Sequence, residues 1–207
     1  RQNLPLLNKI TNKVSSKVRN QYEKSPYPRW VNTRLRFKSI SISEMVSELM
    51  LNLSDDKIKN VKSPHILVAG CGTGEHSIRT ATTFKDSKVL AVDLSASSLS
   101  YAKRKTEELN INNINYMQAD ILHLDKLDRQ FDIVESVGVL HHMDDPITGW
   151  GVLKNCLKKG GLMRIGLYSE LARKHIVEMR EEILSYGLGS SDVEMKSYRN
   201  MLMVSKN

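Results

Sequence analysis

One stretch of the 207-residue sequence decides the fold: His65-Ile66-Leu67-Val68-Ala69-Gly70-Cys71-Gly72-Thr73-Gly74-Glu75-His76. Its apolar first half predicts a short buried parallel strand, and its polar end predicts the start of a helix. Three glycines at alternate positions lie between them, an order typical of a nucleotide cradle. Glycine lets the backbone approach a ligand closely and accepts a positive φ in a tight turn. The unpaired N–H groups at the start of the predicted helix then face the ligand.

Acidic residues follow the next two predicted strands. The strand over 89–92 closes on Asp93, whose carboxylate only accepts hydrogen bonds and has room for both hydroxyls of a ribose. The strand over 114–117 leads to Asp120, which is placed to meet an adenine amino group. A fourth strand begins at Phe131 and runs into a loop over 137–142. Ligands of parallel sheets bind beyond the carboxyl ends of the strands, so we expect all these segments at one edge.

In this order, Ala69–Gly74, Asp93, Ala119-Asp120 and Phe131–Val134 resemble the motifs of class I S-adenosylmethionine-dependent methyltransferases. The resemblance covers about residues 63–170 and implies an α/β fold with a Rossmann-like doubly wound sheet. It also implies S-adenosyl-L-methionine as the cofactor. The residues that it implies as cofactor contacts in this region are Gly70, Cys71, Gly72, Gly74, Asp93, Leu94, Asp120, Ile121 and Val137.

Two other function classes stay open on the same fold. In an NAD-dependent oxidoreductase the fingerprint Gly-x-Gly-x-x-Gly would place its third glycine where this chain has Glu75. An acid beside a pyrophosphate is repelled, whereas S-adenosylmethionine has no phosphate, so this class is disfavoured. A non-catalytic binding module with a decayed pocket is the other alternative. The intact glycines and acids argue against it.

A second informative segment is 21–30, where Pro26 and Pro28 fix φ and make their predecessors extended. The prolines predict a stiff, non-helical segment that displays Tyr27, Arg29 and Trp30 as a docking corner or a site lid.

The same segment resembles the Tyr-x-x-x-Pro-Tyr-Pro-Arg-Trp element of tetratricopeptide-fused methyltransferases and of bacterial outer-membrane-protein lysine methyltransferases. On this resemblance, Arg29 and Trp30 contact the cofactor, with the Arg29 guanidinium on its methionine carboxylate. Tyr22 and Tyr27 then line the methyl channel. The alternative is that Trp30 anchors the segment to the core while Arg29 makes a surface ion pair.

Methyl transfer from a sulfonium is an in-line displacement, so proximity and alignment suffice and no catalytic dyad is required. A lysine acceptor must lose its proton, and the candidate bases are His141, His142, Asp144 and Glu135. One histidine of such a Leu-His-His-Met loop usually packs against the cofactor, and a structural role is the alternative. No Asn/Asp-Pro-Pro-Tyr/Phe tetrad follows the fourth strand, which disfavours nucleic acid as the acceptor.

The composition limits the partners and the cellular location that we expect for the protein. Lysine and arginine outnumber the acids 31 to 23, but they are scattered, so we interpret the net charge of +8 as a solubility feature. Cys71 and Cys156 do not form a disulfide framework, which predicts a reducing, cytoplasmic location. No Cys/His cluster has the spacing of a metal site, and no apolar run approaches the roughly 20 residues of a membrane span. Oligomer formation stays open.

The sequence predicts three segments. Residues 1–60 form an N-terminal helical or lid segment, with an amphipathic helix over 1–20 and a sheet-covering helix over 39–53. Residues 61–170 form the cofactor-binding core, in which Gly160-Gly161 end a helix before the fifth strand. Residues 171–207 supply a helix over 171–186 and one short element over 198–204, an incomplete closing hairpin that we expect to continue in a longer protein.

The function expected from these observations is S-adenosylmethionine-dependent methyl transfer. The acceptor is expected to be a protein lysine side chain, as in the outer-membrane-protein type, with a small molecule as the alternative.

Overall fold

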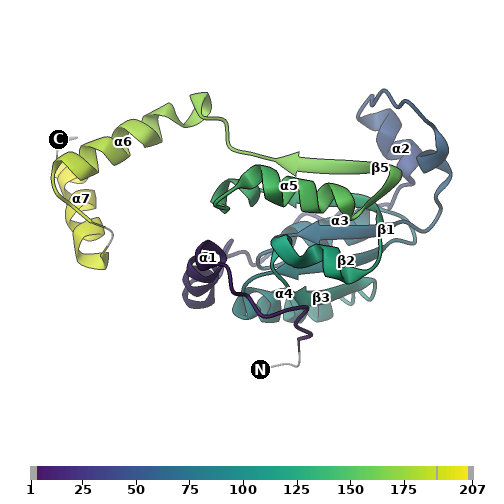
Figure 1. The fold of residues 1–207 in the computed structure, drawn as a ribbon, viewed down its shortest axis with the longest axis horizontal. Helices are drawn as coiled ribbons and strands as arrows, with labels where there is room; N and C mark the ends of the chain where they lie inside the picture. Colours follow the sequence, from purple (N-terminus) through teal and green to yellow (C-terminus); the bar gives the residue numbers. More distant parts are fainter. Residues whose placement is uncertain (1–3, 190, 205–207) are drawn as a thin grey trace. The chain divides into compact units, whose positions relative to one another are not determined.

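The computed structural model describes residues 4–189 and 191–204, and the chain divides into two compact units, residues 1–167 and 168–207. The first unit contains one sheet of five parallel strands in the order β3-β2-β1-β4-β5 (Figure 1). The strand order reverses between β1 and β4, which is where doubly wound sheets bind ligands. The predicted Rossmann-like class I methyltransferase fold is confirmed. The strands are β1 (His65–Ala69), β2 (Lys88–Asp93), β3 (Ile114–Gln118), β4 (Phe131–Val137) and β5 (Leu157–Gly166).

Helices cover both faces of the sheet (Figure 1). The central strand β1 is buried from Ile66 to Ala69, so it reads as a continuous apolar run and not as an alternating one. Two hydrophobic clusters result, one on each face. The first cluster involves α2 (Ile42–Glu48), α3 (Glu75–Thr83), α4 (Ala96–Glu108) and η1 (Lys57–Asn60), and the second involves η2 (Ile121–Leu127), η3 (Leu140–His142) and α5 (Pro146–Asn155).

The N-terminal helix is shorter than predicted and starts later. Helix α1 spans Lys13–Lys24, where the Asn12 side chain accepts from the N–H groups of Val14 and Ser15, both at 2.9 Å. The described residues before it are extended: Leu7 N donates to the Gln118 carbonyl at 3.0 Å, and Gln118 N donates to the Pro5 carbonyl at 2.8 Å. Over residues 4–12 the predicted helix is therefore wrong, because the edge strand β3 offers unpaired backbone groups to this stretch; the prediction for residues 1–3 lies outside the described residues.

Two further predicted boundaries are corrected. The helix expected over 39–53 is limited to α2, which a Ser41–Glu44 capping box starts and which has ended before Met50 takes a φ of 50°. Gly160 and Gly161 do not cap a helix, because α5 ends at Asn155 and both glycines lie inside β5. The β4–β5 register shifts between Phe131 and Ile133, opposite this part of β5.

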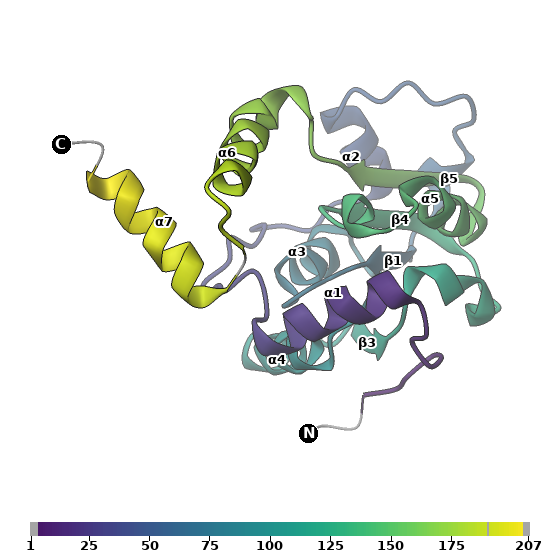
Figure 2. The same ribbon diagram turned by 60° about the vertical axis from the view of Figure 1, so that its left-hand side comes forward.

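The second unit contains η4 (Leu171–Arg173), α6 (Lys174–Ser185) and α7 (Asp192–Val204), shown in green and yellow in Figure 2. The predicted helix after the fifth strand is confirmed as η4 and α6. The element expected over 198–204 is the second half of α7 and no strand. Within residues 168–189 and 191–204, no strand follows β5. A search of the described part of the chain found no helix with the length and apolar character of a bilayer span.

Candidate cofactor site

The glycine loop leaves β1 and crosses the end of β2. The N–H groups of Gly70 and Cys71 both donate to the Val92 carbonyl, at 2.8 and 3.0 Å. Gly74 has a φ of 90° and is the N-cap of α3; its carbonyl accepts from Ile78 N at 2.9 Å, but glycine has no side chain to cap the first N–H groups of the helix. A Cβ on Gly74 would lie 2.5 Å from the Ala102 Cβ of α4. The loop therefore requires glycine here both for its φ and for the approach of α4.

Asp93 lies at the carboxyl end of β2 and holds the glycine loop directly. Its Oδ2 accepts from Gly72 N at 2.8 Å and its Oδ1 accepts from Ser95 N at 2.9 Å. Two carboxylate oxygens have about four acceptor positions, so acceptor capacity for ribose hydroxyls remains. Burial raises the pKa of Asp93, an effect that these backbone hydrogen bonds partly offset.

Asp120 lies at the neighbouring strand end and has an unused oxygen. The Ala119 N–H donates to the Asp93 carbonyl at 3.0 Å, which ties the ends of β3 and β2 together. The Asp120 side chain is 3% exposed, and its Oδ1 accepts from Leu122 N at 3.1 Å. Its buried Oδ2 has no hydrogen-bond partner among the described residues. A buried acceptor without a donor is costly, and the amino group of an adenine is a donor that fits it.

The N-terminal segment packs onto the glycine loop, which the sequence did not predict. Thr73 Oγ1 donates to the Pro28 carbonyl at 2.5 Å, and Trp30 Nε1 donates to the Thr73 carbonyl at 3.2 Å. Gly72 has a φ of 53°, and a Cβ on it would lie 2.7 Å from the Tyr27 carbonyl oxygen. The glycine at position 72 therefore makes room for this segment as well as for a ligand.

The side chains of the segment divide into one buried anchor and several exposed groups. Trp30 is 8% exposed, and Tyr101 of α4 donates a hydrogen bond to its carbonyl oxygen. Tyr27 is 67% exposed and Arg29 is exposed, whereas Tyr22 lies half-buried on α1. The anchoring of the segment by Trp30, expected as the alternative, is what the structure shows. The cofactor contacts expected of Arg29 and Trp30 stay predictions.

The loop after β4 approaches the glycine loop from the other side. A Cβ on Gly70 would lie 2.4 Å from Val139 Cγ2, so this glycine lets the two loops meet. Val137, the last residue of β4, is 40% exposed. The His141 and His142 rings lie in η3 with their centroids 4.3 Å apart, His141 half-buried and His142 exposed. Leu94 is half-buried after β2, whereas Ile121, the first residue of η2, packs into the second core cluster.

Glu135, considered from the sequence as a base, is committed elsewhere. The residue is 4% exposed; its Oε2 accepts from Thr80 Oγ1 at 2.5 Å and lies 3.1 Å from His76 Nε2. Arg164 of β5 lies 3.7 Å from its Oε1. Burial acts to raise the pKa of Glu135, but these neighbours outweigh it and hold the pKa below its ordinary value. The Glu135 carboxylate therefore joins α3 to β4, and its oxygens already interact with Thr80, His76 and Arg164.

The remaining groups add no further chemistry at this site. Cys71 and Cys156 are free and buried, and burial raises the pKa of the Cys71 thiol, with the charge of Asp93 adding to the effect. No group of three or more metal-ligating side chains occurs within residues 4–189 and 191–204.

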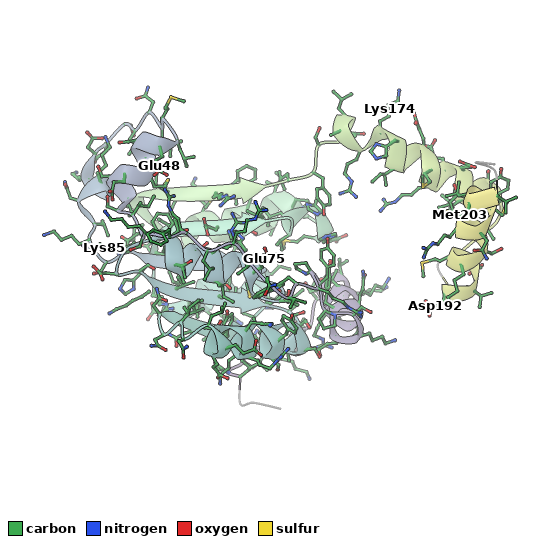
Figure 3. The ribbon with its side chains drawn as sticks, turned by 180° about the vertical axis from the view of Figure 1, so that it is seen from behind. Glu48, Glu75, Lys85, Lys174, Asp192 and Met203 are labelled. Carbon is green, nitrogen blue, oxygen red and sulfur yellow. The ribbon has the colours of Figure 1, made fainter. Side chains whose placement is uncertain are left out.

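Thr33 of the N-terminal segment donates to Glu75 at 3.3 Å; Figure 3 labels Glu75, at the start of α3.

Comparison with known proteins agrees with this geometry. Residues 66–161 match a family model described as a methyltransferase domain. This part of the chain, which holds the glycine loop, both acids and the loop after β4, is therefore similar to methyltransferase domains.

Two relatives place the domain within longer proteins. An uncharacterised protein of Synechococcus sp. is 35% identical over 121 residues, which cover 58% of this chain and 29% of the relative. A ubiquinone biosynthesis O-methyltransferase of Coxiella burnetii is 31% identical over 135 residues, covering 64% of this chain and 53% of the relative. The chain thus spans about half the length, or less, of these relatives.

Solved structures share the fold at low identity. PKMT2 from Rickettsia typhi in complex with AdoHcy superposes with a TM-score of 0.63 at 21% identity, over 86% of this chain and 34% of that one. Magnesium protoporphyrin IX methyltransferase from Synechocystis with bound SAM gives a TM-score of 0.51 at 20% identity, over 73% of this chain and 75% of that one.

Sequence reasoning missed Glu23, Thr73 and Tyr101, which join the N-terminal segment to the core. Glu23 and Thr73 lie inside motifs quoted for other reasons, and Tyr101 lies in a helix that carries no motif. A hydrogen bond between distant residues leaves no periodic pattern in a sequence, so no sequence signal pointed to these three residues.

Proposed function

We propose that this chain supplies the cofactor site and the methyl-transfer step of an S-adenosylmethionine-dependent methyltransferase. The observation that carries the proposal is the buried Asp120 Oδ2, which has no hydrogen-bond partner among the described residues. Asp120 directly follows Ala119, whose N–H donates to the Asp93 carbonyl. The site offers a carboxylate for a ribose and a free acceptor for an adenine amino group, and the first turn of α3 carries the acid Glu75, which would repel a pyrophosphate. This set fits an adenosyl cofactor better than a dinucleotide.

The proposed roles follow the strand ends. Asp93 accepts from the ribose hydroxyls, Asp120 accepts from the adenine amino group, and the exposed Arg29 pairs with the methionine carboxylate. Leu94, Ile121 and Val137 bound the cofactor with apolar surface. The sulfonium supplies the methyl group, and the lone pair of the acceptor displaces the sulfur in line.

Around the methyl group, Tyr22 and Tyr27 form the channel wall, and His141 or His142 takes the proton that the acceptor nitrogen loses. In the proposed domain division, residues 1–60 form the N-terminal helical or lid segment, 61–170 the cofactor-binding core and 171–207 the C-terminal helix and partial closing element.

The acceptor that we propose is a protein lysine side chain. The support is the Tyr-Pro-Arg-Trp element, together with the exposure of Tyr27, Val137 and His142, which leaves room for a macromolecule to reach the site. A small-molecule acceptor is the second candidate, because the relative from Coxiella burnetii is named as a ubiquinone biosynthesis O-methyltransferase. The free cysteines support a reducing compartment, for which we propose the cytoplasm.

Isothermal titration of the chain with S-adenosylhomocysteine, and separately with NADH, tests the proposal. Binding of S-adenosylhomocysteine alone supports it, and binding of NADH alone or of neither ligand contradicts it. A labelled methyl donor, offered with a lysine-rich protein or with a phenolic small molecule, then separates the two acceptors. Label on the protein that persists through denaturation supports lysine methylation, whereas label that partitions into organic solvent supports the small molecule.

A further inference from the structure

The last turn of α1 caps a second helix. Glu23 Oε1 accepts from Ala96 N at 2.5 Å, and its Oε2 accepts from Ser97 N at 3.3 Å and from Ser97 Oγ at 2.5 Å. Ala96 and Ser97 open α4, whose own N-cap, Ser95, accepts with its side chain from Ser98 N at 3.1 Å. A carboxylate at a helix N-terminus satisfies free N–H groups and interacts favourably with the helix dipole. Here that carboxylate comes from another helix.

The same stretch of chain is fastened at its other end. Seven residues beyond Glu23, Trp30 donates to Thr73 of the glycine loop and accepts from Tyr101 in the second turn of α4. Between them, Pro28 accepts from Thr73. Residues 23–30, which we call the strap, therefore contact α4 at two points and the glycine loop between those points. Figure 2 shows the C-terminal end of α1 next to α4.

The strap joins the two elements that hold Asp93. One oxygen of Asp93 accepts from Gly72 in the glycine loop, and the other accepts from Ser95, the residue directly before Ala96. A shift of the start of α4 moves Ser95 and so changes the position of the carboxylate. Glu23 holds that start of α4 without lying in the glycine loop or at a strand end itself.

We propose that Glu23 is a positioning residue for the adenosyl cofactor. By capping α4 it fixes the Asp93–Ser95 turn against the glycine loop, so that cofactor affinity depends on a side chain that does not touch the cofactor. The inference rests on the proposed function, because it assumes that Asp93 receives the ribose. Thermodynamic linkage makes the coupling reciprocal, so bound cofactor also holds the strap in place.

The experiment compares the full 207-residue chain with Glu23→Gln and Glu23→Ala. Glutamine keeps one acceptor oxygen but loses the charge, and alanine loses both. The matched control is Glu107→Gln, the same charge change at an exposed site in the last turn of α4. The readouts are the Kd for S-adenosylhomocysteine by isothermal titration, the Tm of the ligand-free chain, and trypsin cleavage after the exposed Arg29 with and without ligand.

We expect Glu23→Gln to raise the Kd about three- to tenfold, Glu23→Ala to raise it further, and Glu107→Gln to leave it within about twofold. Ligand should slow cleavage after Arg29 in the wild type and do so less in Glu23→Gln. A lower Tm with an unchanged Kd in Glu23→Gln means that the cap is only structural and overturns the inference. If Glu23→Ala fails to fold, the Kd and Tm of Glu23→Gln still test the inference.

The outcomes also separate the inference from the proposed function. Wild-type chain that binds S-adenosylhomocysteine while Glu23→Gln binds it equally well overturns the role of Glu23 and leaves the methyltransferase proposal intact. Wild-type chain that binds no S-adenosylhomocysteine overturns both.

Discussion

The indole Nε1 of Trp30 donates a hydrogen bond of 3.2 Å to the carbonyl oxygen of Thr73, in the middle of the glycine loop. This bond joins the two sequence motifs that stand out along the chain, the proline-rich segment and the glycine loop. The N-terminal segment therefore packs on the candidate cofactor site and is no independent extension.

Replacing Trp30 by phenylalanine should weaken the attachment of the strap. The ring stays apolar, but the buried Thr73 carbonyl loses its donor, which costs about 1–2 kcal/mol of unfolding free energy. The Kd for S-adenosylhomocysteine should rise as well. Denaturant unfolding and isothermal titration measure the two effects. Trp150→Phe, at a more exposed tryptophan on α5, is the control and should leave the Kd unchanged. Equal effects of the two substitutions would contradict the role of the Trp30–Thr73 bond.

Gly72→Ala should disturb the same contact from the loop side. A Cβ there would lie 2.7 Å from the Tyr27 carbonyl oxygen, and the φ of 53° is unfavourable for alanine. We expect a loss of about 1–3 kcal/mol in stability and a Kd about tenfold or more above wild type. Gly151→Ala on α5 is the control, because nothing lies within 4 Å of its Cβ position. That change should be neutral or stabilise the fold by about 0.5–1 kcal/mol. Wild-type affinity in Gly72→Ala would count against the packing described here.

Cofactor affinity should depend on the ionisation of Asp93. The ionised carboxylate accepts from ribose hydroxyls, and Asp93→Ala should weaken binding by about 1–3 kcal/mol. Because burial raises the pKa of Asp93, affinity should begin to fall at a higher pH than for an ordinary aspartate as the solution is acidified. Isothermal titrations with S-adenosylhomocysteine at a series of pH values, from neutral into acid, measure how the Kd depends on pH. In Asp93→Ala the affinity should not fall in this way as the pH is lowered. If the variant shows the same fall, a group other than Asp93 causes the pH dependence.

Glu135→Gln should destabilise the fold in a pH-dependent way. At neutral pH the variant loses the charge that faces His76, Thr80 and Arg164, at an expected cost of about 1–3 kcal/mol. The folded-state pKa of Glu135 lies below its ordinary value, so its contribution is present above the unfolded-state pKa and is lost as the pH falls through the folded-state pKa. Unfolding free energies of variant and wild type should therefore converge in acid.

A second carboxylate provides the control for this stability prediction. Glu48 pairs with Arg36 at 2.5 Å on the surface, and Figure 3 labels it well apart from Glu75. Glu48→Gln should change the unfolding free energy by no more than about 1 kcal/mol, because exposed ion pairs contribute little. A constant difference between Glu135→Gln and wild type at all pH values would contradict the assigned pKa.

The strands of the candidate site, and the glycines and acids at their ends, follow from local patterns in the sequence. Apolar runs that end in Gly70–Gly74, Asp93 and Asp120 predict parallel strands, and the geometry of a parallel sheet then brings their ends to one edge. Hydrophobic burial favours this sheet whatever the rest of the chain does, so strand positions and the acids after them were predictable.

The N-terminal part shows what local patterns leave undecided. The apolar spacing over 1–20 predicts a helix throughout, yet the residues around Leu7 pair with the edge strand β3, because unpaired backbone groups there outweigh a weak helix propensity. The same holds for Gly160-Gly161, whose place inside β5 depends on the register with β4.

By itself, the sequence determined the doubly wound sheet, its order of motifs and the acids at the strand ends, since each depends on residues close together in the chain. Only the tertiary structure decided that the strap covers the glycine loop, that Glu23 caps α4 and that Glu135 is committed to His76 and Thr80. These contacts join residues far apart in sequence, and a hydrogen bond between them forms only after the sheet has brought its partners within reach.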